Sequence, residues 1–177
     1  NDDLLDYFEK LNQRTFLIVE YGVETCNDAT LRLINRGHDF DCAKQAIERT
    51  ASRGIRVGAH IILGLPGEDE NESLRQAPII SSLPLTTLKI HQMQIIRGTK
   101  LAKMYEEHPF HLYSVDEYIH LIAEYISRLR ADLILERFVS QSPPELLIAP
   151  KWGLKNYEFT HRLNNYMKEH CTKKREI

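Results

Sequence analysis

The sequence lacks a long apolar run, a large charge imbalance and a cysteine framework, and each absence excludes a class of protein. No apolar segment approaches the roughly 18 residues that a membrane-spanning helix needs. The formal net charge of −2 and a pI near 6.5 do not suggest an obligatory nucleic-acid or acidic-lipid partner. Three widely spaced cysteines argue against a disulfide framework. The sequence therefore predicts a protein of the reducing cytoplasm with no membrane segment.

The first 98 residues alternate between strand-like and helix-like segments. Compact apolar runs predict three strands, over 16–22, 57–64 and 88–96. Apolar residues at helical spacing predict four helices, over 2–12, 29–35, 41–53 and 70–83. We expect Pro78 to interrupt the last of these. Strands joined by helical crossovers of this length predict an α/β fold with a parallel sheet.

The pattern changes after residue 98, so we expect two parts, 1–98 and 99–177. The second part reads as a mostly helical extension. Three helices are predicted, over 101–108, 114–130 and 156–170, and the letters SVDE predict a capping box at the start of the second. One strand is predicted over 133–139.

Chemistry in a parallel β/α structure is expected beyond the carboxyl ends of the strands. Glu24 follows the first strand at a glycine bend, where its carboxylate suits a ribose or an ammonium group, although a surface acid explains it as well. Arg36 precedes a glycine. Its guanidinium suits a carboxylate or phosphate, although a cation near a helix C-terminus needs no ligand. His60 interrupts an apolar strand and by itself reads as a buried, satisfied histidine.

The turn GLPG at 64–67 follows the second strand, and its glycines let backbone groups approach a flat ligand. The spacing of the histidines and cysteines does not fit a structural metal site. Two pairs lie three or four residues apart, His38 with Cys42 and His108 with His111, and neither has the matching second pair that structural zinc normally needs. No metal ligand is therefore predicted.

Three segments in this order form a more specific pattern: GVETCNDATLRLINRGHDF, GAHIILGLPGE and LKIHQMQIIRGTKL. Together they resemble the second half of a radical S-adenosylmethionine (radical SAM) enzyme, of the bacterial branch similar to the elongator catalytic subunit. Oxygen-independent coproporphyrinogen III oxidase is a more distant cousin. The resemblance covers about residues 16–100, and LLIAPKW at 146–152 is similar to the C-terminal region of the same branch. It implies half of a partial (β/α)6 TIM-like barrel, roughly the fourth to sixth strands.

The resemblance also implies roles for single residues. Glu24 stands where the family contacts SAM, and Arg36 where an arginine pairs with the methionine carboxylate. His60 replaces an acid that contacts the ribose in the porphyrinogen-oxidase cousins, so its own role stays open. The implied SAM-binding residues are Glu24, Arg36, His60, Ile62, Gly64, Leu65, Pro66 and Gln94, and those on the substrate side are Lys89 and His91.

In the family, a [4Fe–4S] cluster held by a CxxxCxxC loop cleaves SAM to a 5′-deoxyadenosyl radical, which abstracts hydrogen from the substrate. Cys26, Cys42 and Cys171 cannot form that loop. We therefore expect the cluster only in a longer parent protein. The N-terminal half of that protein is the expected partner of this chain, and we expect the chain by itself to be inactive.

Unpaired strand edges of a half barrel predict self-association, and the elongator likeness makes RNA a candidate substrate. A non-catalytic half barrel that binds nucleotides or proteins is the alternative, and an ordinary TIM-barrel enzyme that binds phosphate at GLPG is a third possibility.

Overall fold

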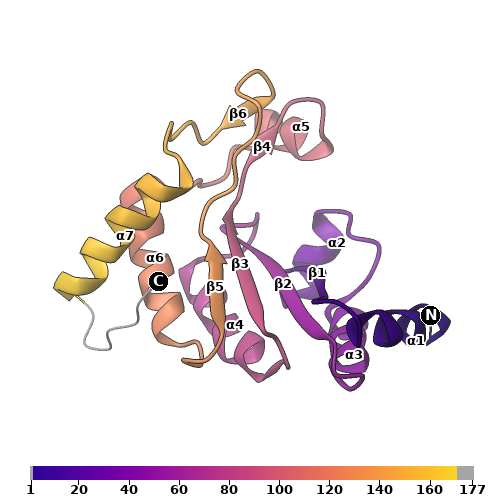
Figure 1. Cartoon of the computed structure of the whole chain (residues 1–177). Coiled ribbons are helices and arrows are strands. Elements are labelled where there is room, and N and C mark those ends of the chain that lie inside the picture. The colour runs from indigo at the N-terminus through magenta and orange to yellow at the C-terminus, as the bar shows by residue number, and fades with distance from the viewer. Residues whose placement is uncertain (1, 171–177) are drawn as a thin grey trace.

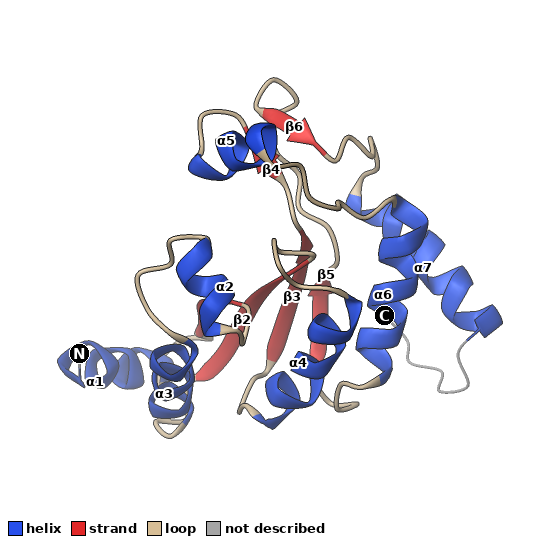
Figure 2. Cartoon of the chain, turned by 180° about the vertical axis from the view of Figure 1, so that it is seen from behind, coloured by secondary structure: helices blue, strands red, loops and turns tan. Residues whose placement is uncertain are grey.

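The computed structural model describes residues 2–170, in which a parallel sheet carries helices on one face (Figures 1 and 2). The sheet has the order β1-β2-β3-β5, and all three neighbouring pairs are parallel. Its strands are β1 (Ile18–Glu24), β2 (Arg56–Leu63), β3 (Thr87–Gln92) and β5 (Ile134–Arg137). The fourth strand thus comes from the segment after residue 98. This sheet confirms the α/β, half-barrel fold class.

Seven helices occur in residues 2–170: α1 (Asp2–Asn12), α2 (Asp28–Leu33), α3 (Phe40–Ala51), α4 (Glu70–Ser82), α5 (Lys100–Glu107), α6 (Val115–Ser127) and α7 (Asn156–His170). The capping box predicted from SVDE is confirmed, because Ser114 and Glu117 bond each other's backbone at the start of α6. None of these helices combines the length and the apolar character that crossing a bilayer would require.

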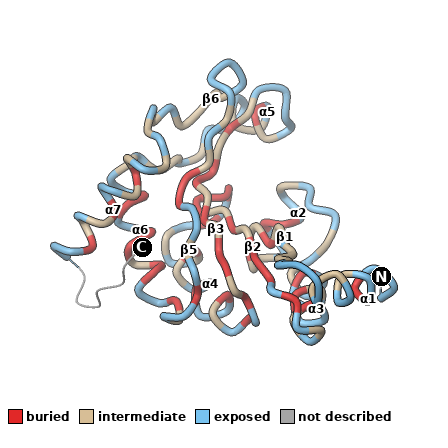
Figure 3. Tube along the Cα trace, in the orientation of Figure 1, coloured by how far each residue is buried: buried red, intermediate tan, exposed pale blue. Residues whose placement is uncertain are grey.

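The core lies between the sheet and the helices that cover it. Alternate side chains of β2 and β3, such as Ile61 and Ile90, are buried in one core cluster with residues of α4 and α6. Figure 3 shows buried stretches along both strands. Because side chains of a strand alternate between faces, His60, Lys89 and His91 project from the opposite, uncovered face. This alternation separates an apolar face from a polar one.

Helix α4 runs through Pro78, so the predicted interruption is wrong. Ala77 and Ile80 on either side of the proline are fully buried in the core. Their packing offsets the single backbone hydrogen bond that proline removes.

The strand predicted over 88–96 is also wrong as one element. β3 ends at Gln92, and β4 (Ile95–Ile96) pairs antiparallel with β6 (Leu147–Ala149) in a separate two-stranded sheet. The chain divides there because Met93 turns into a second apolar cluster with Leu65 and Ile95.

Candidate functional site

Glu24 and Arg36 form an ion pair at the carboxyl end of β1. Arg36 Nη2 lies 3.3 Å from Glu24 Oε1 and donates a hydrogen bond of 2.8 Å to the carbonyl oxygen of Gly22. A Cβ at Gly22 would lie 2.5 Å from that Glu24 oxygen and 2.6 Å from Arg36 Nη2. Glycine is therefore required where the two charged groups meet.

The backbone around Glu24 differs from the prediction. β1 includes Glu24 instead of ending at Gly22, and a bulge separates the two residues. The positive φ, 64°, belongs to Glu24 itself and not to the glycine. A non-glycine residue rarely adopts this conformation, and here it turns the carboxylate toward Arg36.

The GLPG bend follows β2, so it lies at the same edge of the sheet as Glu24. Gly64 has a φ of 82°, and a Cβ there would lie 2.9 Å from the Tyr113 ring. Leu65 and Pro66 are buried. A cavity of about 330 Å³ lies against the bend, between residues 64–70 and the segment 110–113. Its lining includes neither Glu24 nor Arg36.

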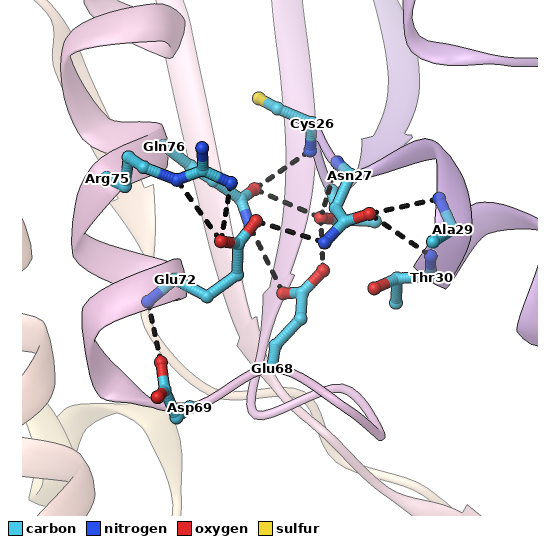
Figure 4. Close-up of polar contacts among 10 residues, drawn as sticks. Cys26, Asn27, Ala29, Thr30, Glu68, Asp69, Glu72, Arg75 and Gln76 are labelled. Carbon is cyan, nitrogen blue, oxygen red and sulfur yellow. Dashed lines mark hydrogen bonds and ion pairs between the residues drawn. The ribbon is translucent and has the colours of Figure 1, made fainter.

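A buried hydrogen-bond network ties this bend to the end of β1 (Figure 4). Thr25 Oγ1 donates to Glu68 Oε1 at 2.5 Å, and Gln76 Nε2 donates to Glu68 Oε2 at 3.1 Å. Gln76 Oε1 in turn accepts from the backbone N–H of Cys26 at 2.8 Å. Glu68 is only 7% exposed. Sequence reasoning missed this network, although Glu68 is the last letter of GLPGE.

Burial raises the pKa of the Glu68 carboxyl above its usual value. Hydrogen bonds from Thr25, Thr30 and Gln76 act against the rise, whereas the charge of Glu72 adds to it. Through its hydrogen bonds with Thr25 and Gln76, the Glu68 carboxyl group holds the GLPG bend against the end of β1.

The uncovered face of the sheet carries a row of charged side chains across all four strands. Glu20 on β1 accepts from His60 Nε2 on β2 at 2.9 Å and also pairs with Lys89 on β3. Lys89 lies 3.2 Å from Glu136 on β5. Hydrogen bonds from Lys89 and His60 lower the pKa of Glu20, and its partner carboxylates raise the pKa of Lys89. Glu20 and Glu136 were not predicted.

His91 stands beside this row without a hydrogen-bond partner for its buried Nδ1. Its ring centroid lies 5.5 Å from that of His60. Burial lowers the pKa of His91 to about 4, with further contributions from the charges of His60, Arg137 and Lys89. The imidazole is therefore neutral at physiological pH and presents an unused polar nitrogen.

Two predicted residues, Ile62 and Gln94, lie outside both of these groups of charged side chains. Ile62 packs with Leu65 in the second apolar cluster. Gln94 bonds residues 140 and 142 instead: its Nε2 donates to the Ser140 carbonyl at 3.2 Å, and its Oε1 accepts from Ser142 Oγ at 2.7 Å. The structure thus joins Glu24 with Arg36, and His60 with Lys89 and His91, while Gln94 belongs to neither group.

The two cysteines that the structure describes, Cys26 and Cys42, do not belong to a group of potential metal ligands. Cys26 is half-buried and Cys42 exposed, and Cys171 lies outside the described residues. Burial raises the pKa of the Cys26 thiol to about 12, and the charges of Glu68, Glu72 and Asp28 add to the rise. Residues 2–170 contain no group of three His, Cys, Asp or Glu side chains arranged to hold a metal ion.

Comparison with protein families identifies the superfamily to which the chain belongs. The Radical SAM superfamily model matches residues 1–75, and the Radical_SAM C-terminal domain model matches residues 85–169. The chain belongs to the radical SAM superfamily and corresponds to the C-terminal region of its Elp3-like branch.

Individual relatives agree with that assignment. The chain is 36% identical over 163 residues to the uncharacterized protein YtqA of Bacillus subtilis, covering 92% of this chain and 51% of YtqA. It is 25% identical over 167 residues to the tRNA uridine(34) acetyltransferase of Methanocaldococcus jannaschii, covering 90% of this chain and 30% of that protein. The solved structure of Methanocaldococcus infernus Elp3 has the same fold, with a TM-score of 0.79 at 21% identity over 92% of this chain and 38% of Elp3.

The chain spans about half the length of the curated relatives that it matches at 30% identity or more. The activity of a whole radical SAM protein is therefore a proposal for this chain.

Proposed function

We propose that this chain is the C-terminal part of a longer radical SAM enzyme and supplies part of the site for SAM. The Glu24–Arg36 pair is the observation that carries the proposal. Two opposite charges meet over a glycine at the carboxyl edge of a parallel sheet, where ligands of such sheets bind. The GLPG bend lies at the same edge.

The groups in this corner fit the parts of SAM. In residues 2–170, Arg36 uses Nη2 for Gly22 and Glu24, so its other N–H groups can bind the methionine carboxylate. The Glu24 carboxylate suits the ammonium group or a ribose hydroxyl. The backbone of Ile62–Leu65 would flank the adenine ring, on the side of the bend that is not packed against Tyr113.

These residues would hold and orient SAM rather than cleave it. When bound beside a reduced [4Fe–4S] cluster, SAM supplies a carbon radical able to abstract hydrogen from a substrate. The cysteines of this chain do not fit that cluster, so the cluster ligands would come from the N-terminal half of the longer protein. We therefore propose that the chain alone is inactive.

The uncovered face of the sheet would meet the substrate. Lys89 and His91 lie on this face, and a complete barrel would enclose them. RNA is our candidate substrate, because three relatives are named tRNA uridine(34) acetyltransferase. We place the protein in the cytoplasm, and we expect the isolated chain to self-associate through the open edges of β1 and β5.

Anaerobic assay of the longer protein tests the proposal. With a reconstituted cluster, dithionite and SAM, we expect 5′-deoxyadenosine and methionine, whereas the 177-residue chain alone should give neither. An upstream sequence without CxxxCxxC, or a reconstituted protein that leaves SAM intact, would contradict the proposal. Either result would favour the non-catalytic half barrel.

A further inference from the structure

A second cavity lies beyond the carboxyl ends of β3 and β5, away from the Glu24–Arg36 corner. Its volume is about 520 Å³, and its walls come from three segments, 92–94, 140–144 and 147–155. We call it the β3–β5 pocket. None of the residues 64–70 that line the cavity at the GLPG bend lines this one.

Two glutamines fix the shape of the β3–β5 pocket. Gln92 bonds the backbone of Ser140 through both ends of its amide, at 2.9 and 2.7 Å. Gln94 bonds the Ser140 carbonyl and accepts from Ser142 Oγ. With both amides tied to residues 140–142, the wall is held in place before any ligand arrives.

The pocket presents positive charge and hydrogen-bond donors without any acid. Lys151 and Lys155 line it, and no Asp or Glu does. Among residues 2–170, neither lysine forms an ion pair, and the Lys155 ammonium lies 6.0 Å from the Tyr157 ring centroid. Unpaired ammonium groups beside amides and hydroxyls suit a ligand with an anionic, acceptor-rich group, such as a phosphate.

An apolar wall completes the pocket. Trp152 lines it, and the indole is fixed by a 3.1 Å hydrogen bond from Nε1 to the Tyr113 carbonyl and by packing against Tyr118 and Phe159. A phosphate alone would leave this wall and most of the volume unused. A flat ring attached to the phosphate would use both.

A larger groove of about 810 Å³ between α4 and α6 lacks this free charge. Its three arginines already pair with carboxylates of their own segments, at 2.5, 2.9 and 2.5 Å: Arg75 with Glu72, Arg128 with Glu124 and Arg130 with Asp132.

We propose that the β3–β5 pocket binds a nucleoside phosphate, either a free nucleotide or one residue of an RNA strand. The lysines would contact the phosphate, and the wall at Trp152 would contact the base. This site is separate from the proposed SAM corner and does not depend on the iron–sulfur cluster.

Trp152 is the single tryptophan of the chain, so its fluorescence reports directly on the pocket. AMP and UMP should each change the emission of the 177-residue chain saturably, whereas adenosine and inorganic phosphate should bind at least tenfold more weakly. A Lys151→Gln/Lys155→Gln double variant should weaken mononucleotide binding by more than tenfold. The matched control is Lys10→Gln/Lys44→Gln, which removes two exposed charges from α1 and α3 (Figure 1) and should bind like the parent chain.

Binding of a single-stranded oligoribonucleotide distinguishes a free nucleotide from one residue of an RNA strand as the ligand. Tighter binding than AMP or UMP would support an RNA residue, and weaker binding a free nucleotide. No emission change with any nucleotide at millimolar concentration would overturn the proposal, and so would an equal loss in the control variant. SAM, which has no phosphate, should not compete with AMP. Competition by SAM would show that the pocket does not require a phosphate and would overturn this inference. The proposed SAM site at Glu24 and Arg36 is tested separately, by the effect of Arg36→Ala on SAM affinity.

Discussion

Replacing Glu68 by alanine should lower the free energy of unfolding by about 2–3 kcal/mol. The substitution removes the acceptor of two buried donors, Thr25 Oγ1 and Gln76 Nε2. Thr25 can turn to Gln76 Oε1, which is 3.1 Å away, but the Gln76 amide then keeps an unsatisfied N–H. Urea unfolding followed by circular dichroism measures the loss.

Glu70→Ala is the matched control for Glu68→Ala. Glu70 lies two residues further along, and its side chain is 45% exposed beside His120. Its removal should change the stability by no more than about 0.5 kcal/mol. Equal losses in the two variants would show that the buried network does not hold the GLPG bend.

Acidification should destabilise the chain through His91 by about 3 kcal/mol between pH 6.5 and 4. The folded pKa of His91, about 4, lies below the ordinary value of 6.5, because burial and the charges of His60, Arg137 and Lys89 oppose protonation. In this window the unfolded chain binds more protons, so stability is complete above pH 6.5 and is lost as the pH falls toward 4. The stability of the parent chain minus that of His91→Phe, measured at each pH, isolates this effect.

The comparison with His91→Phe is needed because the raised pKa of Glu68 changes the stability with pH in the opposite direction. Its folded state binds more protons, so its contribution to stability falls as the pH rises above the ordinary carboxyl value. Glu68 is common to both chains and cancels in the difference. His108→Gln, which changes an exposed histidine, should behave like the parent chain. If the stability difference between the parent chain and His91→Phe stays constant from pH 7 to 4, the burial of a neutral His91 is wrong.

Local patterns were sufficient to predict most elements, but they did not predict the ion pair between Glu24 and Arg36. Apolar spacing identified the helices and the parallel strands, because burial of one face imposes that spacing on the sequence. Glu24 and Arg36 were singled out by family resemblance and lie 3.3 Å apart. Their proposed contact with SAM stays a prediction.

Contacts between distant segments could not be predicted in the same way. An acid after a turn normally reads as exposed, and the burial of Glu68 depends on Gln76 and Thr25, which lie far from it in sequence or on another element. Glu20 was not singled out from the sequence, because its partners His60 and Lys89 lie on other strands. The position of β5 beside β3 is likewise a property of the folded sheet.

The affinity of the longer protein for SAM, measured by calorimetry before and after Arg36→Ala, tests the central claim most directly. If Arg36 binds the methionine carboxylate, the dissociation constant should rise more than tenfold. Arg32→Ala removes an exposed charge from α2, the short helix that precedes Arg36, and should leave the affinity unchanged. An Arg36→Ala protein that binds SAM as tightly as the parent would contradict a SAM site at this corner of the sheet.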